Sequence, residues 1–160
     1  VSRWDGATAS TAPEALRNRL GLLVGRQSYA VYRAFFATDR WQRLLNLGAR
    51  PQRLLFASTG TKDPAAPDDL YVAGLAAPHT VNTMPEETLK AYADHGRAVG
   101  PLLVDPAADA ALAQEFEEAG ISLGELSAQL QTKGAAAFVD SWNAMLGRIQ
   151  AKSGADKVRA

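Results

Sequence analysis

Apolar positions recur at helical spacing over most of the chain, and two short runs that suit strands interrupt them. The chain should therefore be mainly helical by residue count, with a small β component. Residues 67–76 add one or two helical turns between the strand candidates. The spacing predicts longer helices over residues 13–37, 39–47, 86–96, 105–120 and 122–152.

Polar residues at the helix boundaries support these limits. A threonine followed three residues later by a glutamate is typical of a capping box, and Asp or Thr alone also caps helix N-termini. Gly134 predicts a break or kink in the last helix, and residues 153–160 read as a frayed tail. The residues expected to cap helix N-termini are Thr11, Thr38, Thr83 and Asp105.

The two strand candidates differ in character. Arg53–Ser58 is a continuous apolar run, as expected for a parallel strand buried on both faces, whereas Thr80–Thr83 is short. Val1–Asp5 reads like the end of a third strand. Strands that alternate with helices at this spacing indicate an α/β fold with a parallel sheet. Two or three strands are too few for a sheet covered on both faces.

Composition places the chain among ordinary globular proteins. Its 160 residues are 47% hydrophobic and 21% charged, enough for one domain with a core. Cysteine is absent, which excludes disulfides, thiolate metal ligands and cysteine nucleophiles. No apolar run approaches the ~20 residues of a membrane span, and no signal peptide is evident. We therefore expect a cytoplasmic protein with no membrane partner.

Charge is balanced overall but uneven along the chain. Residues 1–53 hold nine arginines against three acidic residues, whereas residues 63–125 carry a net charge of −10. The arginines could bind phosphate or nucleic acid, or they could form a solvated face that pairs with acidic neighbours. We favour the second interpretation. No aromatic-basic repeat accompanies the arginines, so nucleic acid is not expected as a partner.

Candidate chemistry lies where the strands end, because ligands of parallel sheets bind at the carboxyl ends of the strands. Arg3, with its neighbour Ser2, lies in the strand end at Val1–Asp5. Ser58–Lys62 stands at the end of the Arg53–Ser58 run, and Asn82 with Thr83 ends Thr80–Thr83. In the second segment the hydroxyls of Ser58, Thr59 and Thr61 could donate to a phosphate. Gly60 would allow close backbone approach, and Lys62 would supply charge. The alternative is an ordinary polar loop and a surface arginine.

Other side chains offer little chemistry. His79 and His95 lie in separate segments without a carboxylate or cysteine at ligand spacing, so a metal site is not expected. Lys62 sits in a polar loop, which suits anion binding better than Schiff-base formation. Trp4, Trp41 and Trp142 are predicted to anchor a core or an interface.

Several blocks together resemble bacterial transaldolases, in the branch found in actinobacteria and in fusions with glucose-phosphate isomerase. The resemblance covers essentially the whole chain, and the ASTGTK and VNTMP blocks are its most specific parts. The matching blocks are Arg50–Pro64, Asp69–Val72, Thr80–Leu89, Ala93–Gly96 and Phe138–Trp142, with Val1–Arg3 and Asp5 matching the end of a sixth strand.

The resemblance implies a (β/α)8 barrel that moves a dihydroxyacetone unit between sugar phosphates through a lysine Schiff base, without metal or cofactor. Arg3 matches the arginine that grips the substrate phosphate, and Ser58 matches the serine of the seventh-strand phosphate site. Where other branches carry an arginine after that serine, this chain has Thr59 and Gly60, so the charge is assigned to Lys62. Asn82 and Thr83 would line the site.

The family's Schiff-base lysine belongs to the fourth strand and its proton-transfer aspartate to the first, and nothing here matches either. The resemblance therefore implies a partial barrel, with 1–160 as a single C-terminal segment that holds the last strands and helices. Alone it should have no aldol activity, and no catalytic residue is assigned to it. Its expected partners are the sugar-phosphate substrate and either the N-terminal part of the barrel or another copy. The alternative is a non-catalytic helical scaffold or oligomerisation fragment.

Overall fold

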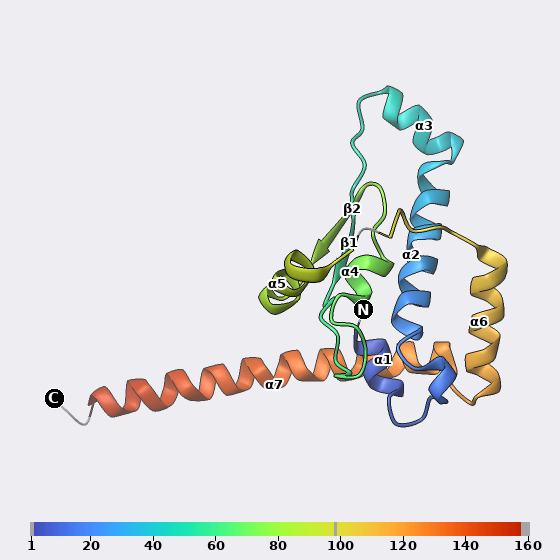
Figure 1. Ribbon diagram of the computed structural model, residues 1–160. Coiled ribbons are helices and arrows are strands. Elements are labelled where there is room, and N and C mark those ends of the chain that lie inside the picture. Colours follow the sequence, from blue (N-terminus) through green and yellow to red (C-terminus); the bar gives the residue numbers. More distant parts are fainter. Residues whose placement is uncertain (1, 98, 158–160) are drawn as a thin grey trace. The chain divides into compact units, whose positions relative to one another are not determined.

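A computed structural model describes residues 2–97 and 99–157, with side chains described as far as Ser153. The chain divides into two compact units, Val1–Ile121 and Ser122–Ala160. The first unit holds the two strands and all helices but the last (Figure 1). In chain order the elements are α1 (Ser2–Thr8), the 3₁₀ turn η1 (Glu14–Leu16), α2 (Leu20–Phe36), α3 (Asp39–Asn46), β1 (Leu54–Ala57), α4 (Leu70–Gly74), β2 (Thr80–Thr83), α5 (Glu86–His95), α6 (Pro106–Glu118) and α7 (Leu123–Lys157).

The two predicted strands form a parallel pair. Leu54 pairs with Thr80 and Ala57 with Thr83, so the two carboxyl ends are level. The connection from β1 to β2 passes through α4, as a parallel pair requires a crossover. The prediction of an α/β chain that is mostly helical and has a parallel sheet is confirmed. Within the described residues that sheet has two strands.

The core of the first unit covers one face of β1. Phe56 is 4% exposed and packs in a buried cluster with Tyr29 of α2 and with Tyr71 and Leu75. Leu55, whose side chain points to the other face, is 50% exposed. The expectation of a strand buried on both faces is therefore wrong for the described chain. α2 and α4 cover one face of β1, and Leu55 shows that the other stays open.

α2 is joined to α6 along its first half, and the two helices run side by side (Figure 1). Phe116 of α6 is fully buried, as is Leu23 of α2. Arg26 Nε lies 2.6 Å from Asp109 Oδ1, and Asp109 is only 4% exposed. The largely buried ion pair links these two helices, and each helix also buries an apolar side chain.

The N-terminal region departs from the sequence prediction. Ser2–Thr8 forms helix α1 rather than the end of a strand, and Val1 lies outside the described residues. The helix expected over residues 13–37 is divided into η1 and α2, with Asn18 between them at φ 59°. The Asp5 carboxylate accepts hydrogen bonds from the first N–H groups of α2, which lets a new helix start there. Thr11 donates to Thr8 O and does not cap a helix.

Two of the other three predicted caps are confirmed. The Thr38 hydroxyl accepts from Trp41 N (3.3 Å), and the Asp105 carboxylate accepts from N–H groups in the first turn of α6. Thr83 is not a cap, because α5 begins after Pro85 and has no side-chain cap. Pro85 occupies the N-cap position instead, with φ −59° and ψ 156°.

The second unit is one long helix. α7 continues through Gly134 without a break, so the predicted kink is wrong; one glycine weakens a helix without interrupting it. The helix also includes residues 153–157, where we expected a frayed tail, and 158–160 lie outside the described residues. Trp142 is 59% exposed. No helix in the described part of the chain is long and apolar enough to cross a membrane.

Candidate functional site

The carboxyl ends of β1 and β2 bring two polar segments together. Ala57 and Thr83 are partners in the parallel ladder, so the residues that follow each strand start from the same edge. Ser58–Lys62 follows β1, and Asn82 and Thr83 end β2. Side chains from the two segments are in contact, since the Thr59 hydroxyl bonds to Asn82.

Ser58 turns the chain sharply at the end of β1. Its φ is 56°, a left-handed conformation that a non-glycine residue adopts at an energetic cost. Its carbonyl oxygen accepts from Ser2 N (3.0 Å), which places the start of α1 beside the end of β1. Arg3 is the next residue of α1 and is exposed. Arg3 therefore lies near this edge, although on a helix and not at the end of a strand.

The hydroxyl of Ser2 is the least satisfied polar group of this region. The residue is 1% exposed, and Oγ has no hydrogen-bond partner within residues 2–97 and 99–157. A buried hydroxyl without a partner costs free energy. It lies in the residue that bonds to Ser58, so it is a further donor available near the candidate site. The sequence placed no role on it beyond its position next to Arg3.

Thr59 ties the two strand ends together. It is fully buried, and its hydroxyl donates to Asn82 Oδ1 (2.6 Å), with Thr83 O 3.3 Å away. Because the amide oxygen of Asn82 is engaged in this way, its NH2 group is the part left to meet a ligand. Thr59, predicted as a phosphate donor, acts instead as the residue that orients Asn82.

The next two residues shape the loop. A Cβ on Gly60 would lie 2.8 Å from Pro85 Cγ, so glycine is needed for close contact between this loop and the start of α5. The sequence alone suggested close approach of an anion as the role of this glycine, and that role stays a prediction. The Thr61 hydroxyl donates to Pro67 O (2.9 Å), which closes the loop on itself and leaves that hydroxyl with a structural partner.

Lys62 lies between two cavities. One, of about 240 Å³, is lined by Gly60, Lys62 and Thr88 among others, and a second of about 330 Å³ is lined by Arg17, Lys62 and Asp5 among others. Neither cavity is lined by Arg3, Ser58, Asn82 or Thr83. The structure thus places Ser58, Asn82 and Thr83 at the strand ends and Gly60 with Lys62 at a cavity. Arg3 is near Ser58 because its neighbour Ser2 forms a backbone hydrogen bond to Ser58.

Carboxylates share both cavities with Lys62: Asp5 and Asp63 line one, and Asp68 and Glu87 line the other. The Lys62 side chain is exposed, which is unlike the desolvated setting that a Schiff-base lysine needs. Its neighbour Asp63 accepts from Asn18 Nδ2 (2.7 Å) and from Ala65 N (2.9 Å). The Asn18 bond is the main cause of a pKa below the usual 3.8, followed by the Ala65 bond. Asp63 therefore stays ionised, and its carboxylate is held by hydrogen bonds to these two groups.

Asp5 is the residue that sequence reasoning missed. It is 6% exposed, and its carboxylate accepts from Leu20 N (2.9 Å), Gly21 N (3.1 Å) and the Tyr71 hydroxyl (2.5 Å). Burial, and then the contact with Asp5, raise the pKa of Tyr71 well above its usual 10.0. Asp5 joins α1, α2 and α4, and it lines the cavity that Lys62 also lines. No local pattern around residue 5 marks these partners.

His95 forms a second polar contact near this edge. Its Nε2 lies 2.9 Å from Asp68 Oδ1 and its Nδ1 3.2 Å from Asp94 Oδ2. The bond to Asp68, ahead of that to Asp94, raises the pKa of His95 above 6.5. Across the described ranges, no group of three or more His, Cys, Asp or Glu side chains is placed to hold a metal ion.

A parallel pair with polar side chains at its carboxyl edge is an arrangement shared by many α/β enzymes. Sequence comparison identifies the family among these enzymes. The sequence model of the transaldolase/fructose-6-phosphate aldolase family matches residues 1–149, and the chain belongs to this family. The resemblance to actinobacterial transaldolases is confirmed by its relatives.

Three curated relatives illustrate the match, and each is named transaldolase. The protein of Parafrankia sp. (strain EAN1pec) is 46% identical over 157 residues, 96% of this chain and 42% of its own length. That of Arthrobacter sp. (strain FB24) is 43% identical over 94% of this chain and 43% of its own length. That of Thermobifida fusca (strain YX) is 47% identical over 84% and 37%. The chain thus spans about two fifths of the length of these relatives.

Proposed function

We propose that this chain is the C-terminal segment of a transaldolase and supplies its substrate-phosphate site. The intact enzyme would move a dihydroxyacetone unit from sedoheptulose 7-phosphate to glyceraldehyde 3-phosphate, giving erythrose 4-phosphate and fructose 6-phosphate. The Schiff-base lysine would lie outside these residues. Family membership supports the reaction class, and the observation that carries the site is the polar cluster at the carboxyl ends of β1 and β2.

The proposed fold is the last part of a (β/α)8 barrel. The open face of β1 supports this proposal, because strands of a barrel carry helices outside and other strands' side chains inside. Leu55 is half exposed on the face that α2 and α4 leave uncovered. The partner of that face would be the N-terminal part of the barrel. The cytoplasmic location expected from the sequence remains a prediction.

In the proposed site, Ser58, Lys62 and Arg3 bind the phosphate, and Asn82 and Thr83 line the pocket. A phosphate dianion is best held by hydrogen bonds from charged and hydroxyl donors. Lys62 is exposed and, across the parts of the chain that are described, forms no ion pair. The cation is therefore available to a ligand.

The test is a chimera in which this chain replaces the matching C-terminal part of the Parafrankia transaldolase. The folded chimera should convert fructose 6-phosphate and erythrose 4-phosphate, and borohydride should trap a sugar–lysine adduct. The isolated 160-residue chain should give no adduct. A chimera with native circular dichroism but no activity, or an adduct on the isolated chain, would contradict the proposal.

Substitutions in the chimera then test the phosphate site. Ser58→Ala and Lys62→Ala should each raise the KM for fructose 6-phosphate by about tenfold, the effect of losing one hydrogen bond to a charged group. Ser58→Gly removes the hydroxyl and relieves the positive φ. If Ser58→Gly has the wild-type KM, the turn conformation and not the hydroxyl is what substrate binding requires. Ser28→Ala and Lys133→Ala, both at exposed helical positions, are the matched controls.

A second candidate is a non-catalytic scaffold that self-associates. The exposed apolar stripe of α7 favours it: Phe138 is 80%, Trp142 59% and Ile149 55% exposed, at spacings that place them on one side of the helix. Light scattering separates the candidates. If the chimera forms a concentration-dependent dimer whose dissociation constant does not change in the Trp142→Ser variant, this stripe is not the dimer contact.

A further inference from the structure

Seven of the nine arginines in residues 1–53 form no ion pair within residues 2–97 and 99–157. Arg19, the residue before α2, and Arg26, in the first half of α2, form ion pairs with Glu115 and Asp109. The expectation that the arginines pair with acidic neighbours therefore holds there. Beyond that point, within residues 2–97 and 99–157, none of the later arginines forms an ion pair. These exposed arginines are Arg33, Arg40, Arg43, Arg50 and Arg53.

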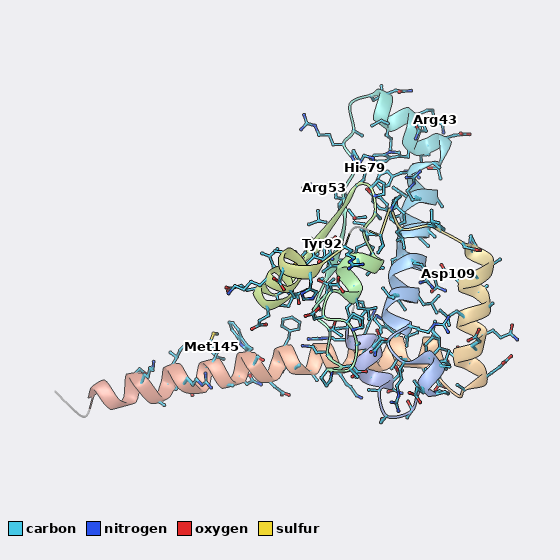
Figure 2. The ribbon with its side chains drawn as sticks, in the orientation of Figure 1. Arg43, Arg53, His79, Tyr92, Asp109 and Met145 are labelled. Carbon is cyan, nitrogen blue, oxygen red and sulfur yellow. The ribbon has the colours of Figure 1, made fainter. Side chains whose placement is uncertain are left out.

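The unpaired arginines gather at the end of the first unit where the strands begin. Arg43 lies on α3, Arg53 immediately precedes β1, and His79 immediately precedes β2 (Figure 2). Asp39 is the only acidic residue between positions 33 and 53, so this stretch has a net charge of +4. A positive surface of this density attracts anions. It lies at the opposite end of the strands from the proposed sugar-phosphate site.

Aromatic side chains accompany these arginines. The ring of Phe36 packs edge-on against Tyr32 (centroids 4.7 Å apart) and against Trp41 (4.6 Å). All three rings are only partly buried. By contrast, Tyr29 of the same helix is 3% exposed. The cluster therefore presents aromatic surface to solvent beside the positive charge.

These rings line a cavity of about 390 Å³, together with Arg33 and His79. Small-molecule sites begin at about 300 Å³, so this cavity is of the size that holds a ligand. Its walls are tied to one another. The Tyr32 hydroxyl donates to His79 O (3.4 Å), and His79 is held at φ 61°. Gln42 Nε2 donates to Phe36 O (2.7 Å), which links α3 to the end of α2.

We propose that this cavity binds a nucleoside phosphate. The base would stack on the aromatic side chains, a contact that every nucleobase can make, and the phosphates would meet Arg33, the arginine among the cavity's lining residues. An inorganic anion would gain nothing from the rings, and an uncharged aromatic compound would gain nothing from the arginines. The combination selects a ligand that carries both groups.

Isothermal titration of the full 160-residue chain with ATP, adenosine and tripolyphosphate tests this proposal. ATP should bind with one site per chain and about tenfold more tightly than either fragment, because stacking and phosphate contacts both contribute. Its affinity should fall as salt is raised. Fructose 6-phosphate should not compete, and Lys62→Ala should leave the affinity for ATP unchanged, which separates this site from the proposed sugar-phosphate site.

Variants locate the contacts. Arg33→Gln and Trp41→Leu should each weaken ATP binding by about tenfold, whereas Trp41→Phe, which keeps a ring, should retain most of the affinity. Arg148→Gln makes the same change of charge on the exposed surface of α7 and is the matched control. If Trp41→Leu loses its circular dichroism, Arg33→Gln, a substitution at an exposed position, decides the question.

Three results would overturn the proposal. If tripolyphosphate bound as tightly as ATP, the binding would be due to surface charge alone and the rings would contribute nothing. An equal loss of ATP affinity in Arg148→Gln and Arg33→Gln would also indicate binding through surface charge alone. A poly-glutamate peptide that displaces ATP and binds more tightly would assign the surface to an acidic protein segment.

Discussion

Removal of the Asp5 carboxylate should lower the free energy of unfolding of the first unit more than any other single substitution near the site. Asp5→Ala leaves three donors without their acceptor: Leu20 N, Gly21 N and the buried hydroxyl of Tyr71. Each buried donor left unpaired costs about 1–3 kcal/mol, and we expect about 4 kcal/mol in total because water can reach part of the helix terminus. With a urea m value of about 2 kcal/mol/M, the midpoint should fall by about 2 M.

The assay is urea unfolding followed by the fluorescence of Trp4, which neighbours Asp5 in α1, in a chain whose other two tryptophans are phenylalanine. Tyr71→Phe alone should cost about 1–2 kcal/mol, since Asp5 keeps its two backbone donors. The double variant should cost less than the sum, because the unpaired phenol is then absent. A midpoint shift below about 0.5 M for Asp5→Ala, or strict additivity, would refute the account of Asp5 as the acceptor that joins three helices.

The same contact has a pH signature. The pKa of Tyr71 is raised above 10.0, first by burial and then by Asp5, so folding favours the protonated phenol. The stabilisation is fully present below pH 10 and is lost as the pH rises further toward the folded-state pKa. The wild-type chain should lose stability above pH 10 more steeply than Tyr71→Phe, which has no phenol at this position to titrate.

Three other predictions concern helix contacts. Asp109→Ala should cost about 3 kcal/mol in thermal melts because it leaves a half-buried guanidinium without its partner, whereas Glu115→Ala, in an exposed pair, should cost under about 1 kcal/mol. By NMR, His95 should titrate above pH 6.5 and return toward that value in Asp68→Asn; its ion pair is present below 6.5 and is lost as the pH rises through the raised pKa. Gly134→Ala should stabilise α7 by about 0.5–1 kcal/mol, because the helix is continuous and a Cβ there meets nothing within 4 Å. Destabilisation by this change would indicate a kink after all.

The features that sequence reasoning predicted correctly are those that a few neighbouring residues specify. Thr38 and Asp105 cap the helices that follow them, and the apolar run before Ser58 forms the strand it suggested. A cap or a short buried strand depends on side chains within one turn or one ladder of its own position. The carboxyl edge of the sheet could be located for the same reason.

The contacts that organise the site were not predictable in this way. Asp5 reaches the start of α2, Ser2 bonds to Ser58, and Thr59 bonds to Asn82, and in each case the partners are separated by many residues. One sequence without relatives carries no local mark of such pairs. Gly60 was singled out correctly as special, but the contact that requires it is with Pro85.

The parallel pairing of two four-residue strands also bears on the order in which the protein folds. β1 and β2 cannot form their ladder until residues 58–79, which include α4, have brought the two strands together. Closing this loop costs conformational entropy before the contacts between the strands can stabilise it. The bond from Thr59 to Asn82 needs both strand ends in place. Helices α2 and α3, which are consecutive in the chain, can form earlier from local contacts. The two ends of the sheet should therefore mature at different times: the aromatic and basic end with the first helices, and the proposed sugar-phosphate end as one of the last parts to become native.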